Sequence, residues 1–212
     1  MTRPLSRSWR DARFVVIDVE TTGLDPRRDE VISFAGIPIE SARILTAEAV
    51  HGLVRPHVAP GDASIAIHRL REDDLAAAPR APEALAPLAA VMGGRIPVVH
   101  ASWVERTFLR KAGCPLPRRI VDTAVLWRRL SIERGGRDPG ICSLSVIAMS
   151  LGLPSHRPHE AEGDALTAAQ AFLAMATHLE ARGHATVRAL TRARLDLRGW
   201  QLWHGPEEFR SG

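Results

Sequence analysis

Residues 14–19, FVVIDV, form a short apolar run rich in β-branched side chains, which is typical of a buried central strand. The segment GLDPRRDE that follows contains Gly23 and Pro26 and predicts a turn. The chain therefore has to build a sheet around this strand, and the rest of the sequence shows what can surround it.

Two further strands are predicted directly after the turn. They are VISFAGIPIE and ARILTAEAVHGLV, separated by a tight connection near Ser41, and their succession favours an antiparallel hairpin or meander beside the first strand. Residues 56–67 have the composition of a loop, with Pro56, Pro60 and Gly61. Helical character begins near Asp73 and continues through PEALAPLAAVM, where Pro82 suits an early helix position.

Strands and helices alternate in the second half. A strand is predicted at RIPVVH (95–100), followed by a helix that Ser102 can cap and Gly113 can end. IVDTAVLWRRL predicts a brief strand running into a helix, LSVIAMSLGL a further helix, and residues 162–182 the longest helix. This order predicts an α/β fold whose sheet has an antiparallel component.

The composition of the chain indicates where in the cell the protein is located. The chain has 212 residues, 45% of them hydrophobic, but no apolar run of about 18 residues that would span a membrane. The basic segment 1–12 lacks the apolar region of a secretory signal, and two cysteines cannot form a disulfide framework. We therefore expect a cytoplasmic protein. The net charge is +4, and all the positively charged side chains except Lys111 are arginines. This is compatible with a polyanionic partner or with a compositional preference for arginine.

The first chemical signal is a pair of acids at the end of the buried strand. Asp18 and Glu20 are two residues apart, so both side chains project from the same face of a strand. Buried carboxylates need partners or metals, and hard oxygen ligands of this kind select Mg²⁺ or Mn²⁺. The alternative is that the strand ends at Val19 and both acids are solvated.

The second signal is His159 in a loop, five residues before Asp164 at the start of the longest helix. A histidine beside a carboxylate-metal site can act as a general base on a water molecule. The alternative is that Asp164 serves only as a helix cap or an acid of the first turn.

Together these segments resemble the DEDDh-type 3′–5′ exonucleases, the group that includes the proofreading exonuclease subunits of bacterial replicases. Asp18-x-Glu20-Thr-Thr-Gly is similar to the first family motif, and His159-x4-Asp164-Ala is similar to the third. The second motif is approached by residues 99–109, VHASWVERTFL, with one departure: Glu105 stands where the family has Asp. Ala101 likewise replaces the usual Asn. The alternative for Glu105 is an exposed helix acid.

The resemblance implies a ribonuclease-H-like fold with a central mixed five-stranded sheet flanked by helices. It implies that Asp18, Glu20, Glu105 and Asp164 hold two divalent cations, Mg²⁺ or Mn²⁺, and that His159 takes a proton from the attacking water. The expected products are nucleoside 5′-monophosphates released from the 3′ ends of nucleic acid.

The resemblance also suggests which residues bind the substrate end. Thr21 and Thr22 are expected near the terminal 3′-hydroxyl, and Leu24 or His68 against the last base. Trp103 could stack on a base or turn into the core. His100 could be structural. Four arginines after Gly183 could follow phosphates or form a solvated helix face: Arg188, Arg192, Arg194 and Arg198.

We expect a basic N-terminal extension (1–12), an exonuclease domain (13–183) and a C-terminal helical extension (184–212). The Thr21-Thr22 pair favours single-stranded or frayed DNA over RNA, with an RNA-trimming exonuclease as an alternative. The short stretch after Gly183, with Gln201-Leu202-Trp203 only faintly similar to a clamp-binding peptide, favours a stand-alone exonuclease, although a polymerase or repair partner is compatible with the resemblance. A catalytically weakened nucleic-acid-binding scaffold is the alternative from another class, supported by Glu105 and Ala101.

Overall fold

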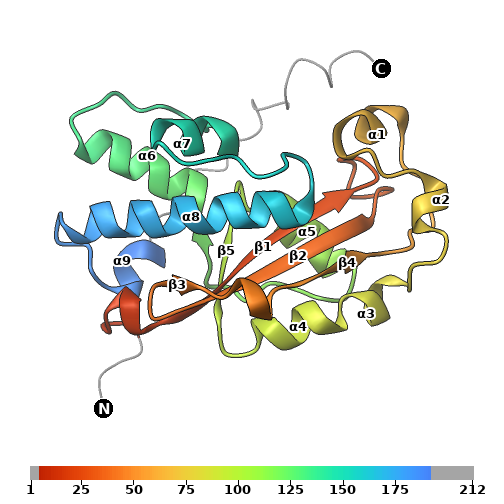
Figure 1. The fold of residues 1–212 in the computed structure, drawn as a ribbon, viewed down its shortest axis with the longest axis horizontal. Coiled ribbons are helices and arrows are strands. Elements are labelled where there is room, and N and C mark those ends of the chain that lie inside the picture. Colours follow the sequence, from red (N-terminus) through yellow and green to blue (C-terminus); the bar gives the residue numbers. More distant parts are fainter. Residues whose placement is uncertain (1–4, 192–212) are drawn as a thin grey trace.

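The computed structural model describes residues 5–191, which form one mixed sheet covered by helices (Figure 1). β1 (Arg13–Thr21) lies at its centre, antiparallel to β2 (Val31–Glu40) and parallel to β5 (Ile96–Val99). β6 (Val121–Asp122) extends the parallel part beyond β5. The buried run at residues 14–19 is therefore the central strand that its composition predicts.

Two short strands complete the other edge, both antiparallel to β2: β3 (Arg43–Ile44) and β4 (Val50–Leu53). The prediction of one continuous strand from residue 42 to residue 54 is wrong, because the 3-10 turn η2 (Thr46–Glu48) interrupts it. The described sheet consequently has six strands instead of five, while its mixed character is as predicted.

Helices occupy both faces of the sheet. The long α8 crosses one face together with α6, α7 and α9, and α3, α4 and α5 cover the other (Figure 1). Their bounds are η1 (Trp9–Asp11), α1 (Asp62–His68), α2 (Glu72–Leu75), α3 (Ala81–Ala84), α4 (Ala86–Met92), α5 (Trp103–Lys111), α6 (Thr123–Glu133), α7 (Leu144–Ser150), α8 (Ala161–Glu180) and α9 (Val187–Thr191).

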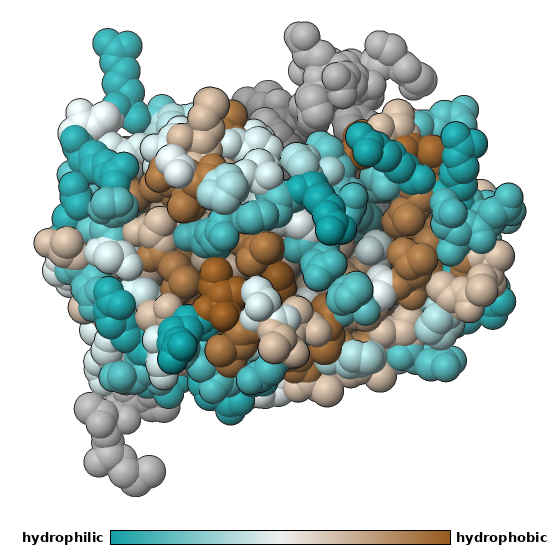
Figure 2. Space-filling view, viewed as in Figure 1, coloured by the Kyte–Doolittle hydropathy of each residue, from teal (hydrophilic) through white to brown (hydrophobic). Residues whose placement is uncertain are grey.

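Alternation along β1 divides the core into two parts. Phe14 and Val16 belong to the cluster under α8, whereas Val15 and Ile17 belong to the cluster under α4 and α5. This is the two-residue period of a strand buried on both faces. Figure 2 shows apolar side chains still visible over the middle of this face of the molecule. Leu166 and Leu173 of α8 are partly buried and pack against the first cluster.

The loop predicted for residues 56–67 is wrong over its second half, where α1 begins at Asp62. Gly61 directly precedes this helix, and Asp62 supplies an acid in its first turn. The Ser64 side chain then joins α1 to the first strand, since its Oγ donates to the carbonyl of Thr22 at 2.8 Å.

The segments at the two ends of the described chain pack on the same core. Trp9 is 1% exposed, and Val187 and Leu190 on α9 are equally buried. An isolated β-bridge joins Ser8 to Thr186. Within residues 5–191, no helix combines the length and the apolar character that crossing a membrane requires.

Candidate active site

Asp18 and Glu20 lie on the β1 face that is turned toward α8. They continue the row that Phe14 and Val16 begin, so the two-residue period that buries those side chains also directs both carboxylates toward the same helix. A β-bulge between Glu20 and Thr21 then shifts the register with β2, and the pairing resumes at Thr21 and Val31.

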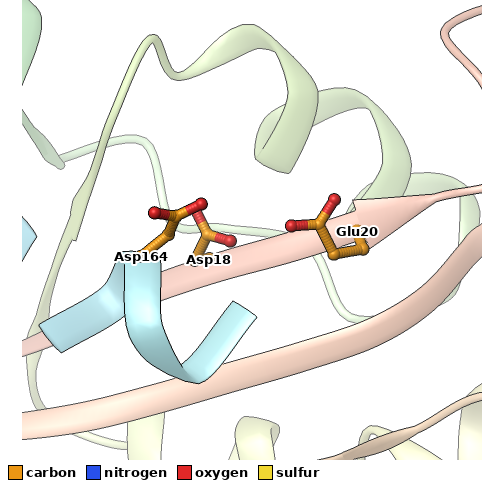
Figure 3. A group of neighbouring side chains, drawn as sticks. All are labelled: Asp18, Glu20 and Asp164. Atoms are coloured by element: carbon orange, nitrogen blue, oxygen red, sulfur yellow. The ribbon is translucent and has the colours of Figure 1, made fainter. Parts of the chain in front are cut away.

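Asp164 joins this pair from the first turn of α8. One carboxylate oxygen from each of Asp18, Glu20 and Asp164 lies within 4.8 Å of the other two. Figure 3 shows the three side chains pointing toward one another, two from the strand and one from the helix. The alternative in which the two strand acids are simply solvated does not describe this arrangement.

The three acids repel one another in a poorly solvated site. Burial is the main cause that raises the pKa of Asp18 well above its ordinary value, and the charges of Glu20 and Asp164 raise it further. Burial, followed by the charge of Asp164, raises the pKa of Glu20 to about 8. Burial also raises the pKa of Asp164, against the opposing effect of the His159 backbone amide.

Glu105 lies on α5 at the edge of the same cavity but outside the group of three. Its side chain is buried, with 3% of the residue exposed, and its Oε2 has no hydrogen-bond partner among the described residues. Burial is the largest cause that raises its pKa, followed by the charges of Asp122 and Glu20. It is therefore not the exposed helix acid of the alternative interpretation.

This donor set fits divalent cations. Four carboxylates supply only hard oxygen ligands, and the unpaired Oε2 of Glu105 is a buried acceptor that no described group satisfies.

Asp122 positions the start of α5, a role that the sequence analysis missed. Its Oδ2 accepts the Ser102 amide at 2.9 Å, and its Oδ1 accepts the amides of Ala101 and, at the start of α6, Ala124. The side chain of Ser102, predicted to cap α5, makes no capping hydrogen bond. An acid directly before the helical segment TAVLW is a recognisable N-cap signal. Its hydrogen bonds to Ala101 and Ser102 are tertiary contacts, which the sequence does not reveal.

His159 is exposed in the loop before α8, in a left-handed conformation with φ of 65°. Its backbone amide donates to Asp164 Oδ2 at 2.9 Å, which fixes the loop to the acid. The first turn of α8 permits this close approach, because a Cβ on Gly163 would lie 2.3 Å from the carbonyl oxygen of His156.

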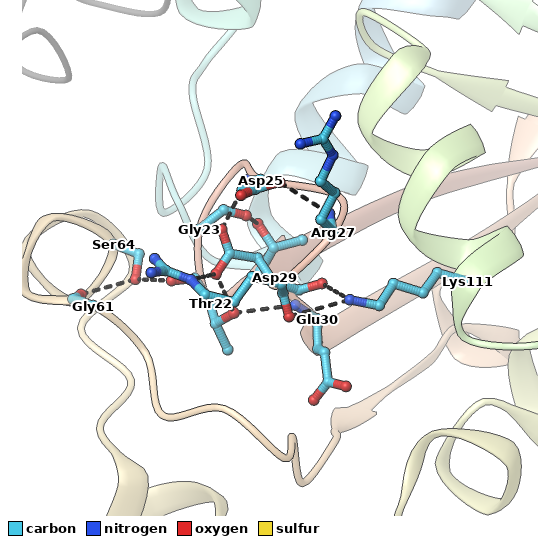
Figure 4. A network of polar contacts seen from close by, with 11 residues as sticks. Thr22, Gly23, Asp25, Arg27, Asp29, Glu30, Gly61, Ser64 and Lys111 are labelled. Carbon is cyan, nitrogen blue, oxygen red and sulfur yellow. Dashed lines mark hydrogen bonds and ion pairs between the residues drawn. The ribbon is translucent and has the colours of Figure 1, made fainter.

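The turn after β1 is fixed by a network around Thr22 and Asp29 (Figure 4). Asp29, which is 3% exposed, accepts from the Thr22 hydroxyl at 3.1 Å and from the Asp25 amide at 2.8 Å. Lys111 of α5 donates to the carbonyl of Asp29 at 2.7 Å. Asp29 was not singled out in the sequence, although an acid at the end of a Gly- and Pro-containing turn is a usable signal.

The predicted substrate residues divide into two groups. Thr21, Leu24, His68 and Trp103 line the cavity around the acids, whereas the buried Thr22 side chain is directed into the Asp29 network. His68 Nδ1 accepts the Leu70 amide at 3.0 Å, and its buried Nε2 has no hydrogen-bond partner within residues 5–191. Trp103 also packs on Phe108, with ring centroids 6.1 Å apart, so it contributes to both the cavity and the core.

The cavity has a volume of about 280 Å³. His100 also lines it, and its Nδ1 lies 2.9 Å from the Thr123 hydroxyl. Arg188 lies on α9, beyond the end of α8 opposite to Asp164, and Arg192, Arg194 and Arg198 lie outside the described residues. The remaining lining residues are His159, Val19, Gly23, Ser64, Ile67, Ala101 and Val104.

Comparison with known proteins gives a family for this arrangement. Residues 15–172 match the family RNase_T, described as exonuclease. The chain is 32% identical over 184 residues to a DNA polymerase III subunit epsilon-like protein of Rhodobacter capsulatus, covering 84% of this chain and 25% of that protein. The chain thus spans about a quarter of the length of this relative. It is also 31% identical over 171 residues to the PolC-type DNA polymerase III of Thermotoga petrophila. That match covers 78% of this chain and 12% of the polymerase.

Solved structures share the fold. Exonuclease X in complex with 5′ overhanging duplex DNA superposes with a TM-score of 0.65 at 23% identity, covering 84% of this chain and 98% of that one. The nuclease domain of 3′hExo, a DEDDh family member bound to rAMP, has a TM-score of 0.65 at 18% identity, covering 80% and 94%. The match of most of the chain, together with the motifs at Asp18, Glu105 and His159, shows that this protein belongs to the exonuclease family of the DEDDh type.

Proposed function

We propose that this chain is a 3′–5′ exonuclease that hydrolyses phosphodiester bonds at nucleic-acid ends and releases nucleoside 5′-monophosphates. The observation that carries the proposal is the convergence of Asp18, Glu20 and Asp164 within 4.8 Å, beside the buried Glu105. Four acids around one cavity carry a large electrostatic cost in the fold, and a cation-dependent reaction explains why they lie together.

Asp18, Glu20, Glu105 and Asp164 would hold two divalent cations, Mg²⁺ or Mn²⁺. Bound cations would neutralise charge on the phosphate oxygens and lower the pKa of the attacking water. Without counter-charge, a phosphodiester approaching four carboxylates would be repelled. The acids of this chain therefore have to be ionised and compensated before the substrate can enter.

His159 would accept the proton of the attacking water. The bond from its amide to Asp164 keeps its loop next to the acids, while its exposed side chain can pass the proton on to solvent. The ring nitrogen of an imidazole can take a proton from water and release it again, as a general base must.

Substrate ends would be held by the side chains that line the rest of the cavity. Leu24 is 40% exposed at the mouth of the cavity, where it can lie against the last base. His68 lines the same cavity and would contribute to the surface that meets the last base. Trp103 offers an aromatic surface to the same end.

DNA is the proposed substrate, in single-stranded or frayed form. Two relatives that are 32% and 31% identical are named as DNA polymerase III proteins, and the Thr21-Thr22 pair supports the same direction. These names also support a polymerase as a partner, but the proposed chemistry requires only the nucleic-acid end.

The test is hydrolysis of 5′-labelled single-stranded and 3′-overhanging oligonucleotides, as DNA and as RNA, with Mg²⁺ or Mn²⁺. Stepwise shortening from the 3′ end is expected, with the DNA substrate cleaved faster, and Asp18→Asn is expected to abolish it. Asp73→Asn on the exposed α2 makes the same charge change away from the cavity and should cleave normally. Binding without cleavage of any substrate would reject the enzyme in favour of a nucleic-acid-binding module.

A further inference from the structure

A second cavity, of about 310 Å³, lies at the opposite end of α5 from the acids. Its walls come from the start of β2, the segment after β4, the start of α3 and the last turn of α5. It shares no lining residue with the acidic cavity. Its lining residues are Glu30, Val31, Val54, Arg55, Pro56, His57, Arg80, Ala81, Pro82, Phe108, Lys111, Ala112 and Gly113.

Three cations give this basic cavity its character. Arg55, Arg80 and Lys111 form no ion pair with a carboxylate within residues 5–191. Glu30 is the one acid in the lining, and its Oε1 lies 3.3 Å from His57 Nδ1. The cavity therefore carries an excess of positive charge.

Backbone carbonyls hold these cations in place without neutralising them. Arg80 donates to the carbonyl of Pro56 at 2.6 Å, and Arg55 donates to that of Ala76 at 3.3 Å. Both bonds use the Nη1 nitrogen, so the planar guanidinium groups keep further donors for an anion. Lys111 donates to the carbonyl of Asp29 at 2.7 Å and brings its charge to the same wall.

The lining also has an apolar wall. Pro82 is exposed there, and Val31, Val54 and Phe108, which are at most 2% exposed, complete it. An occupant that satisfies both walls has an anionic group and an apolar or aromatic part. A nucleotide unit, with its phosphate and its base, has this composition.

Two elements connect the basic cavity to the acidic one. Trp103 and Glu105, in the first turn of α5, line the acidic cavity, whereas Phe108 and Lys111 line the basic one. At 1.5 Å per residue, six residues of helix separate them by about 9 Å. The loop after β1 also serves both, with Leu24 on the acidic side and Glu30 on the other; Figure 4 shows Lys111 reaching its backbone.

We propose that the basic cavity binds a nucleotide unit of the nucleic-acid substrate away from the end being hydrolysed. Its phosphate contacts Arg55, Arg80 and Lys111, and its sugar or base lies against the apolar wall. This inference rests on the proposed exonuclease function, and it assigns the cavity to the same substrate.

The effect of substrate length and the salt dependence of binding separate a contact in the basic cavity from hydrolysis at the acids. A dinucleotide has a single internucleotide phosphate, which is the one hydrolysed at the acids, whereas an oligonucleotide of twelve residues has further phosphates for the basic cavity. Each phosphate neutralised by a cation adds about 0.7 to the slope of log K against log salt for a single strand. Losing the contact should therefore weaken binding of the longer substrate alone and flatten its salt dependence.

The variants are Arg55→Gln and Arg55→Glu, chosen because Arg55 is exposed and makes one long bond to the backbone. Arg134→Gln is the matched control, an exposed arginine after α6. Fluorescence anisotropy would measure the affinity of the wild-type protein and each variant for a 5′-labelled oligothymidylate of twelve nucleotides, with chelator and at several salt concentrations. Hydrolysis of the same oligomer and of a thymidine dinucleotide would be measured with Mg²⁺.

Arg55→Gln is expected to weaken binding of the long oligomer by about 3- to 10-fold and to reduce the salt slope by about 0.7, with Arg55→Glu having the larger effect. Dinucleotide hydrolysis should be unchanged. The proposal is overturned when Arg55→Glu binds the long oligomer with the affinity and salt slope of Arg134→Gln. A wild-type protein that hydrolyses neither substrate but loses affinity on Arg55→Glu would instead reject the exonuclease function and keep the cavity.

Discussion

Among single residues, Glu20 shows how the acids of the site destabilise the folded protein when no cation is bound. It is held near two like charges, and its pKa rises from 4.5 to about 8. For an acid whose pKa is raised on folding, the stabilising protonated form is fully present below the unfolded pKa and is lost as pH rises through the folded one. Between pH 4.5 and about 8, metal-free protein should therefore lose stability because of Glu20.

Replacing Glu20 with Gln is expected to stabilise the metal-free protein at pH 8 and to change little at pH 5. The gain should be about 2 kcal/mol, since one pKa unit corresponds to about 1.4 kcal/mol and a half-buried group is partly screened by solvent. Urea unfolding at the two pH values, in the presence of chelator, would measure it. An equal effect of Glu20→Gln at both pH values would show that repulsion between the acids is not its cause.

Glu105 is the residue at which this chain departs from the family motif. Its unpaired Oε2 is the feature that connects it with bound cations. Glu105→Gln keeps the shape of the side chain and removes the charge, so hydrolysis should fall by about 100-fold or more while the fold is retained. Glu105→Asp should stay active and shift the Mg²⁺ concentration that gives half-maximal rate.

Rates over a range of Mg²⁺ and Mn²⁺ concentrations would separate the two Glu105 variants. Circular dichroism would confirm that each is folded. A Glu105→Gln protein with the wild-type rate and metal dependence would remove Glu105 from the proposed metal ligands.

At the scale of elements, the junction between the His159 loop and α8 is the tightest feature of the site. Gly163 leaves room for the loop, and Thr167 one turn later donates its hydroxyl to the Gly163 carbonyl and accepts the His156 amide. The loop is thus held against the helix along one turn. His159 and Asp164 are brought together by this packing.

Gly163→Ala should push the loop away from α8, because the new Cβ would lie 2.5 Å from the carbonyl oxygen of Arg157 as well. We expect a loss of stability of about 1–3 kcal/mol and a fall in kcat of about 10- to 100-fold, with a smaller change in KM. Steady-state kinetics and thermal unfolding would test this. The neighbouring exposed Glu162→Ala is the control, and a Gly163→Ala enzyme with unchanged kcat would show that the loop position is not critical.

For the whole molecule, the site connects β1, α5 and α8, which belong to both halves of the core. A cation bound by carboxylates from these three elements would bind the folded chain and not the unfolded one. Metal binding should therefore raise the free energy of unfolding of the whole chain.

Saturating Mn²⁺ is expected to raise the free energy of unfolding by about 3 kcal/mol at one hundred times its dissociation constant. The increase should be larger at pH 8 than at pH 5, because protonated carboxylates bind metal poorly. Thermal melts with Mn²⁺ and with chelator, for the wild-type protein and for Asp18→Asn, would measure it. The same increase in Asp18→Asn would place the stabilising ion elsewhere.

Local patterns in the sequence determined much of the fold and part of the site. The apolar run at residues 14–19 predicted the central strand, and its two-residue period placed Asp18 and Glu20 on one face before any neighbour was known. The long helix from residue 161 and the ends of several helices at glycine were also predictable. Short segments failed: α1 and the break between β3 and β4 carry weak local preferences, so packing determines their structure.

Only the tertiary structure decided what the acids can do together. The sequence separates Glu20 from Asp164 by most of the chain, and their proximity depends on how α8 packs on the sheet. The buried state of Glu105 depends on α5, whose start is held by Asp122 from β6. The period of side chains along a strand and the residue preferences of a turn involve only a few neighbouring residues, so they can be recognised in the sequence. Electrostatic repulsion and burial depend on distances between residues that are far apart in the sequence, and only the packed core sets these distances.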